Sequence, residues 1–150
     1  MGVFPEQATH WDWIAEQVKR AGRPLRVLNL FGYTALASLA AAQAGAPVTH
    51  VDASKKVIAW GKENQALSGL EHRPIRWLVD DAFKFVAREG RRASQYDGLI
   101  LDPPKFGRGP KGEVWEFFKL MPDLLGACRN LLSKEPAFLV LTAYAVPVSS

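Results

Sequence analysis

Five short apolar runs, each separated from the next by a longer segment with helical spacing, constrain the fold of this chain more than any other feature. We expect these runs to be strands: Pro24–Leu30, Val48–Asp52, Ile75–Val79, Gly98–Leu101 and Ala137–Thr142. Strands that are apolar along their whole length are typical of a parallel sheet buried on both faces. The alternation therefore predicts the α/β class, with a doubly wound, mostly parallel, Rossmann-like sheet covered by helices.

The segments around the strands carry helix signals. Thr9 and Asp12 indicate a capping box on a first helix that runs to about Ala21. Further helices are expected at Ala35–Ala44, from a Ser54 cap to about Leu67, at Ala82–Arg88 and at Glu113–Leu132. Gly45 stands where a C-terminal cap belongs, and Pro122 should kink or split the last helix.

The length of 150 residues is enough for one domain with a real core. We predict one domain over residues 1–150, with an N-terminal segment and first helix at 1–23 and the sheet core at 24–150. Doubly wound sheets usually continue for one or two more strands. We therefore expect this domain to be truncated after the fifth strand, and so incomplete at its C-terminus.

Composition excludes several classes of protein. Hydrophobic residues make up 48% of the chain and charged residues 23%, which argues against a disordered tail, a collagen-like repeat or a coiled coil. No apolar run approaches the ~18 residues that span a bilayer, so no membrane partner is expected. The single cysteine, Cys128, excludes an internal disulfide and fits a reducing compartment, and the start of the chain lacks a secretion signal. We expect a cytoplasmic protein, whose oligomeric state the sequence leaves open.

The net charge says less about the function than the composition does. A net charge of +4 fits either a solvated surface with extra lysines or a face that attracts a polyanion such as nucleic acid. The three histidines, His10, His50 and His72, have no metal-ligand spacing, so no metal site is expected.

In sheets of this kind, ligands bind beyond the carboxyl ends of the strands, near the point where the strand order reverses. The first strand leads into a turn at Gly32, where glycine permits a tight bend and a close approach of the backbone to a ligand. Neither a P-loop nor G-x-G-x-x-G is present. The turn therefore suits a ligand without a pyrophosphate, or it is a plain structural turn.

Acidic residues end the next strands. Asp52, twenty positions after Gly32, can accept hydrogen bonds from both ribose hydroxyls, or it can assist the cap at Ser54. Asp80 and Asp81 can serve an adenine amino group, or they can favour the positive end of the following helix. A nucleoside site is indicated more strongly by these positions together than by any one alone.

The fourth strand ends in Asp102-Pro103-Pro104. Two consecutive prolines fix φ twice and donate no hydrogen bonds, so they favour a rigid elbow that aims the Asp102 carboxylate into the cleft. A purely structural turn is the alternative.

Together, Val27–Thr34, Val51–Ser54, Asp80–Asp81 and Asp102–Phe106 resemble successive motifs of the class I S-adenosylmethionine-dependent methyltransferases. More narrowly, they are similar to bacterial methyltransferases related to the cytosine-C5 enzymes of large-subunit ribosomal RNA. The resemblance implies S-adenosylmethionine as cofactor, bound by Asn29, Phe31, Gly32, Tyr33, Thr34, Asp52, Ala53, Asp80, Asp81 and Asp102. Methyl transfer would involve Asp102, Pro103, Pro104 and Lys105.

Two departures from those relatives bear on the chemistry. The cytosine-C5 enzymes carry a catalytic cysteine just after the fifth strand, whereas residues 141–146 contain none, and the leucine-rich surroundings of Cys128 predict a core residue. The aromatic ring of the Asp-Pro-Pro elbow, Phe106, comes one residue later than in amine-methylating relatives. Amine methylation is therefore permitted, and cytosine-C5 chemistry is disfavoured.

The sequence thus predicts an enzyme that transfers a methyl group from S-adenosylmethionine to RNA, most naturally ribosomal RNA. Two alternatives stay open. A nicotinamide-dependent Rossmann oxidoreductase would explain the sheet and Asp52, but neither the missing glycines nor the Asp-Pro-Pro elbow. A non-catalytic domain that binds a cofactor or only pairs with another subunit is the other.

Overall fold

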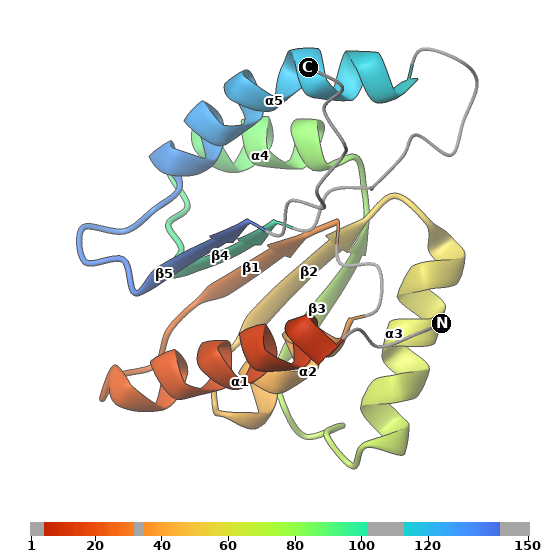
Figure 1. The fold of residues 1–150 in the computed structure, drawn as a ribbon, viewed down its shortest axis with the longest axis vertical. Coiled ribbons are helices and arrows are strands. Elements are labelled where there is room, and N and C mark those ends of the chain that lie inside the picture. Colours follow the sequence, from red (N-terminus) through yellow and green to blue (C-terminus); the bar gives the residue numbers. More distant parts are fainter. Residues whose placement is uncertain (1–4, 32–34, 102–112, 142–150) are drawn as a thin grey trace.

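The computed structural model describes residues 5–31, 35–101 and 113–141. Within them lies a five-stranded, all-parallel sheet in the order β3-β2-β1-β4-β5 (Figure 1). The strands are β1 (Val27–Leu30), β2 (Val48–Asp52), β3 (Ile75–Val79), β4 (Gly98–Leu101) and β5 (Phe138–Leu141). The helices are α1 (Pro5–Arg20), α2 (Leu36–Gln43), α3 (Lys55–Leu67), α4 (Ala82–Arg91) and α5 (Glu113–Asn130). The predicted α/β class and doubly wound parallel sheet are confirmed.

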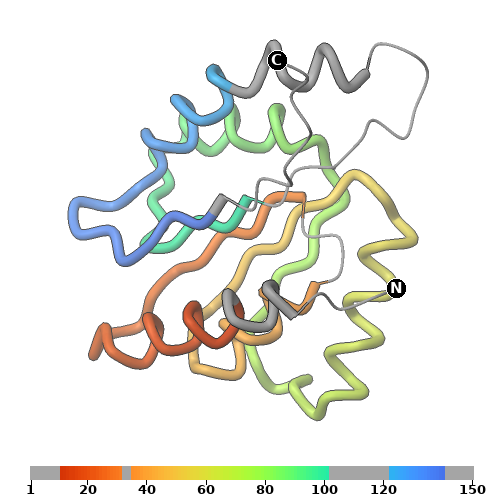
Figure 2. The backbone as a smooth tube through the Cα atoms, viewed as in Figure 1, coloured from red at the N-terminus to blue at the C-terminus, as the bar shows by residue number. Residues whose placement is uncertain are grey.

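The chain reverses its direction of travel across the sheet after β3. From β1 it steps through α2 to β2 and through α3 to β3, and it then crosses back to place β4 on the free side of β1 (Figure 2). Leu30 of β1 pairs with Val51 of β2 on one side and with Leu101 of β4 on the other. The reversal of strand order therefore lies at the carboxyl ends of β1 and β4, where sheets of this type bind ligands.

Helices cover both faces of the sheet, with α1 and α2 on one face and α4 and α5 on the other (Figure 1). Alternate strand residues serve the two layers: Val27 packs in the α1–α2 layer, whereas Leu28 packs in the α4–α5 layer. Because both directions are buried, the strand needs no exposed polar side, and its one polar residue, Asn29, is buried too.

Helix α3 packs closely on β3 through one glycine. At Gly61, a Cβ atom would overlap the ring of Trp77. The Trp77 indole N–H donates to Gln65 Oε1 at 2.9 Å, which ties the strand to the same helix. Among the residues that the structure describes, no helix is long and apolar enough to cross a membrane.

Some predicted boundaries differ from the structure. Helix α1 begins at Pro5, ahead of the capping box expected at Thr9, because proline is well tolerated in a first turn, where no N–H is needed. Strand β1 begins only at Val27, whose N–H donates to Pro47 O at 3.0 Å and opens the ladder. Helix α5 runs through Pro122 as one element, so a split helix is wrong.

Candidate functional site

Backbone hydrogen bonds bring the ends of β1, β2 and β3 to one edge of the sheet. The Phe31 N–H donates to Val51 O at 3.1 Å, and the Asp80 N–H donates to Asp52 O at 3.0 Å. Phe31 has a φ of 61°, in the left-handed region that residues other than glycine seldom adopt. Backbone in such a conformation is common at binding and active sites, and the reversal of strand order lies beside it, so we take this edge as the candidate site.

Asp52 lies partly buried at the end of β2. Its Oδ1 accepts from the Ser54 N–H at 2.8 Å, and Ser54 Oγ accepts from the Val57 N–H at 3.2 Å to cap α3. Burial raises the pKa of Asp52, and the hydrogen bond from Ser54 only partly opposes that rise. The cap role predicted for this pair is therefore present, and a carboxylate with two oxygens is able to serve a ligand as well. Ala53, between them, is exposed.

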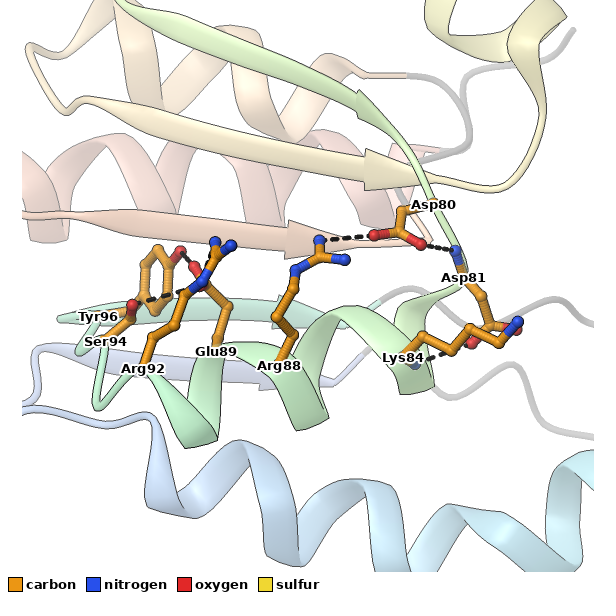
Figure 3. A network of polar contacts seen from close by, with 8 residues as sticks. All are labelled: Asp80, Asp81, Lys84, Arg88, Glu89, Arg92, Ser94 and Tyr96. Carbon is orange, nitrogen blue, oxygen red and sulfur yellow. Dashed lines mark hydrogen bonds and ion pairs between the residues drawn. The ribbon is translucent and has the colours of Figure 1, made fainter.

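Asp80 and Asp81 follow β3 and are held differently (Figure 3). Asp80 accepts from Arg88 Nη2 at 2.7 Å and from the Asp81 N–H at 2.8 Å, so both of its oxygens are engaged. The hydrogen bond from Arg88 is the main cause that lowers the pKa of Asp80. Asp81 is exposed, and its Oδ1 accepts from the Lys84 N–H at 3.1 Å to cap α4. Of the two, Asp81 has the carboxylate better placed to take a ligand, and its role with adenine stays a prediction.

Asn29 lies one residue before the end of β1 and is only 2% exposed. Its Nδ2 donates to Ser38 Oγ of α2 at 3.0 Å. Within the described residues, its Oδ1 has no hydrogen-bond partner. A buried acceptor of this kind calls for a donor, and the ammonium group of an amino-acid ligand would supply one. The residues at this edge thus fit the nucleoside and amino-acid ends of the implied cofactor.

Several predicted site residues lie outside the described residues: Gly32, Tyr33, Thr34, Asp102, Pro103, Pro104, Lys105 and Phe106. Their assigned roles stay predictions. Sequence reasoning missed two buried polar residues next to Asn29, namely Ser38 and His50. The available signals were a serine in an alanine-rich helix and a histidine inside an apolar strand.

Cys128 is the core residue that the sequence predicts. It is 1% exposed, and it packs in the α4–α5 layer with Leu124 and Leu131. Burial raises the pKa of its thiol to about 12, so the thiolate required of a nucleophile is disfavoured. No cluster of three or more His, Cys, Asp or Glu side chains suited to a metal ion occurs within the described ranges.

Comparison with known proteins places these features in a family. Residues 1–140 match the S-adenosylmethionine-dependent methyltransferase family. Curated relatives named ribosomal RNA large subunit methyltransferase K/L are 39% identical over 120 residues in Shewanella sp. (strain ANA-3) and 43% identical over 119 residues in Shewanella baltica. Each alignment covers 77% of this chain, which spans only 16% of the length of either relative.

Solved structures similar to this chain include methyltransferases, in agreement with the family match. A SAM-dependent methyltransferase from Agrobacterium tumefaciens is 61% identical, with a TM-score of 0.88 over 97% of this chain and 46% of that one. The structure of SMU.776 complexed with SAH is 29% identical, with a TM-score of 0.73 over 88% of this chain and 34% of that one. With its doubly wound sheet and the polar residues at the ends of β1 to β3, the chain belongs to the S-adenosylmethionine-dependent methyltransferases, and S-adenosylmethionine is its cofactor.

Proposed function

We propose that the protein transfers the methyl group of S-adenosylmethionine to RNA, with ribosomal RNA as the substrate class. The observation that carries the proposal is the arrangement of Phe31, Asp52 and Asp80 along the carboxyl edge of the sheet, beside the β1–β4 point where the strand order reverses. The curated relatives of the chain are, in addition, named for ribosomal RNA. A cytoplasmic location belongs to the same proposal. The family match favours this activity over nicotinamide-dependent oxidation.

Each residue of the site binds a different part of the cofactor. Asp52 accepts hydrogen bonds from the ribose, Asp81 faces the adenine, and Asn29 accepts from the amino-acid end of the cofactor. The Asp102-Pro103-Pro104 elbow, which follows β4 directly in the sequence, holds the acceptor atom of the substrate. Lys105 and Phe106 contact the RNA by charge and by stacking, respectively.

The cofactor brings a sulfonium that is already an activated methyl donor. The protein therefore contributes alignment more than acid–base chemistry, and alignment alone supplies a large part of many enzymatic rates. The burial and raised pKa of Cys128 argue against covalent attack on a pyrimidine by this residue. Direct displacement, without an enzyme–RNA adduct through Cys128, follows.

The test compares cofactor binding with methyl transfer in the full chain. The substrate is unfractionated RNA from cells that lack the enzyme, and the variant is Asp102→Ala. We expect nearly unchanged affinity for S-adenosylhomocysteine and a loss of single-turnover transfer of at least ~100-fold, since an error of about 1 Å in alignment costs that much. An equal loss of binding and rate would make Asp102 a cofactor ligand only.

Two other outcomes would overturn the proposal itself. Protection of the wild-type protein against heat by NAD but not by S-adenosylhomocysteine would point to an oxidoreductase. Tight binding of S-adenosylhomocysteine with no transfer to any RNA fraction would point to a non-catalytic domain.

A further inference from the structure

We propose that Ser38 and His50 are positioning residues of the cofactor site, and that they turn the carbonyl oxygen of Asn29 toward the ammonium group of the cofactor. This inference rests on the proposed function, because it requires a cofactor with an amino-acid end. Neither residue needs to touch the cofactor. They act through Asn29, and the three residues are called the relay below.

The relay is continuous and buried. Asn29 Nδ2 donates to Ser38 Oγ at 3.0 Å, and Ser38 Oγ lies 2.8 Å from His50 Nδ1. Exposure is 2% for Asn29 and 0% for the other two. A serine hydroxyl carries one proton and accepts others. Asn29 supplies the proton of the first bond, and the direction of the second depends on the tautomer of His50. We assign His50 the tautomer in which Nδ1 carries no proton, so that Ser38 donates its own proton to this nitrogen.

This order of donors fixes the orientation of the Asn29 amide. Its NH₂ group is committed to Ser38, so its Oδ1 faces away from Ser38 and has no partner among the described residues. With His50 in this tautomer, a flipped amide would turn Oδ1 toward a hydroxyl whose proton is already given to His50, and the bond would be lost. His50 thereby selects which end of the Asn29 amide is offered at the end of β1.

The histidine is in turn held from the side of α3. Its ring packs on Trp77 with the centroids 4.7 Å apart, and the Trp77 indole N–H donates to Gln65 Oε1. The absence of a side chain at Gly61 leaves room for this indole. The arrangement thus spans β1, β2 and β3, and it delivers a single oriented acceptor to the edge of the sheet where the cofactor binds.

A relay that only stabilised the fold would affect every ligand of the site alike. Two ligands separate the possibilities. S-adenosylhomocysteine carries the amino-acid end, whereas 5′-methylthioadenosine has the same adenosine and thioether without it. Loss of an oriented Asn29 acceptor should weaken the first ligand and spare the second.

The experiment measures the affinity of both ligands by calorimetry in the full chain, for wild type, Ser38→Ala, Asn29→Ala and the double variant. We expect Ser38→Ala to weaken S-adenosylhomocysteine roughly 3- to 10-fold, the scale of one hydrogen bond. Binding of 5′-methylthioadenosine should change by less than about twofold, and Ser38→Ala should have no further effect once Asn29 is alanine.

Two more variants keep the test decisive. His50→Phe removes the Nδ1 acceptor but keeps a ring against Trp77, and it should repeat the ligand-selective loss even if Ser38→Ala folds poorly. Thr49→Val removes a buried hydroxyl from the same strand outside the relay, and it should affect neither ligand. Equal weakening of both ligands by Ser38→Ala, or none, would overturn the inference. Failure of the wild type to bind either ligand would instead contradict the proposed function.

Discussion

Burial and ligand binding have opposite effects on the charge of Asp52. Burial disfavours the charged carboxylate, whereas the proposed hydrogen bonds from the ribose favour it. Burial raises the pKa of its carboxyl, so the folded chain holds this proton more tightly than the unfolded chain does. The charged form therefore costs folding free energy. That cost is absent below the ordinary pKa of an aspartic acid and fully present above the raised pKa.

We predict that Asp52→Asn raises the free energy of unfolding at neutral pH and weakens S-adenosylhomocysteine by about 10-fold, the scale of a charge-assisted hydrogen bond. In the wild type, the affinity for S-adenosylhomocysteine should fall as the pH drops through the raised pKa of Asp52. In the Asp52→Asn variant, this pH dependence of the affinity should be absent. Urea unfolding and calorimetry across the acidic range measure both effects. An identical pH profile in the variant would contradict the role of the Asp52 charge.

Cys128 gives a second residue-scale prediction. Its thiol is buried against leucines, and its pKa is about 12. Cys128→Ala should leave methyl transfer within a few-fold of wild type and lower the free energy of unfolding by about 1 kcal/mol through lost packing. Transfer assays test the expected activity, and thermal unfolding tests the expected loss of stability. A covalent RNA adduct that disappears in this variant would restore cytosine-C5 chemistry.

The sequence predicted single residues best where the chemistry is local. The Ser54 cap and the acidic ends of β2 and β3 could be read directly, because they depend on neighbours within a few positions. Whether Asp52 caps or binds could not be decided, since a carboxylate does both. Ser38 and His50 were missed because their pairing joins residues twelve positions apart on different elements.

At the scale of elements, the boundaries of β2, β3 and β4 were predicted correctly, whereas the starts of β1 and α1 were not. The correct strands are bounded by charged or turn-forming residues next to them in the sequence. The start of β1 is instead set by its ladder partner, since pairing begins when the Val27 N–H reaches Pro47 O. Which residue of one strand pairs with which residue of the next is settled only when the sheet assembles, so the start of β1 could not be predicted from its own sequence.

The packing of α3 on β3 gives the element-scale prediction. Gly61→Ala would force a methyl group into the Trp77 ring, and overpacking of this kind costs about 1–3 kcal/mol. Gly126→Ala is the matched control, because this helical glycine in α5 has open space around its missing Cβ. Helix propensity alone should make the control more stable by about 0.5–1 kcal/mol. Chemical unfolding of both variants measures the difference, and equal effects would show that the Trp77 contact does not matter.

Across the whole molecule, the two ends of the sheet are specialised differently. The carboxyl ends carry the candidate site, whereas the amino ends are fastened by Asp97, just before β4. Its carboxylate accepts from the Arg26 N–H at 2.9 Å, from Ser133 Oγ at 2.7 Å and from Arg23 Nη1 at 3.1 Å. These bonds join the segments that lead into β1, β4 and β5. We therefore expect a mutation at the amino ends to change stability without changing cofactor binding.

Asp97→Asn tests this separation. Burial acts to raise the pKa of Asp97, but the bonds from Arg26, Ser133 and Arg23 outweigh it and hold the pKa below its ordinary value. The resulting stabilisation is fully present above the ordinary pKa of an aspartic acid, and it is lost as the pH falls through the lowered one. The variant should therefore lose about 1–3 kcal/mol of unfolding free energy at neutral pH, and the deficit should shrink in acid.

Asp123→Asn, on the exposed side of α5, controls for the loss of one charge. S-adenosylhomocysteine affinity should stay within about twofold of wild type, because Asp97 lies at the opposite end of the sheet from the site. A deficit that is equal in acid and at neutral pH, or a loss of cofactor affinity in folded protein, would show that the two ends are coupled.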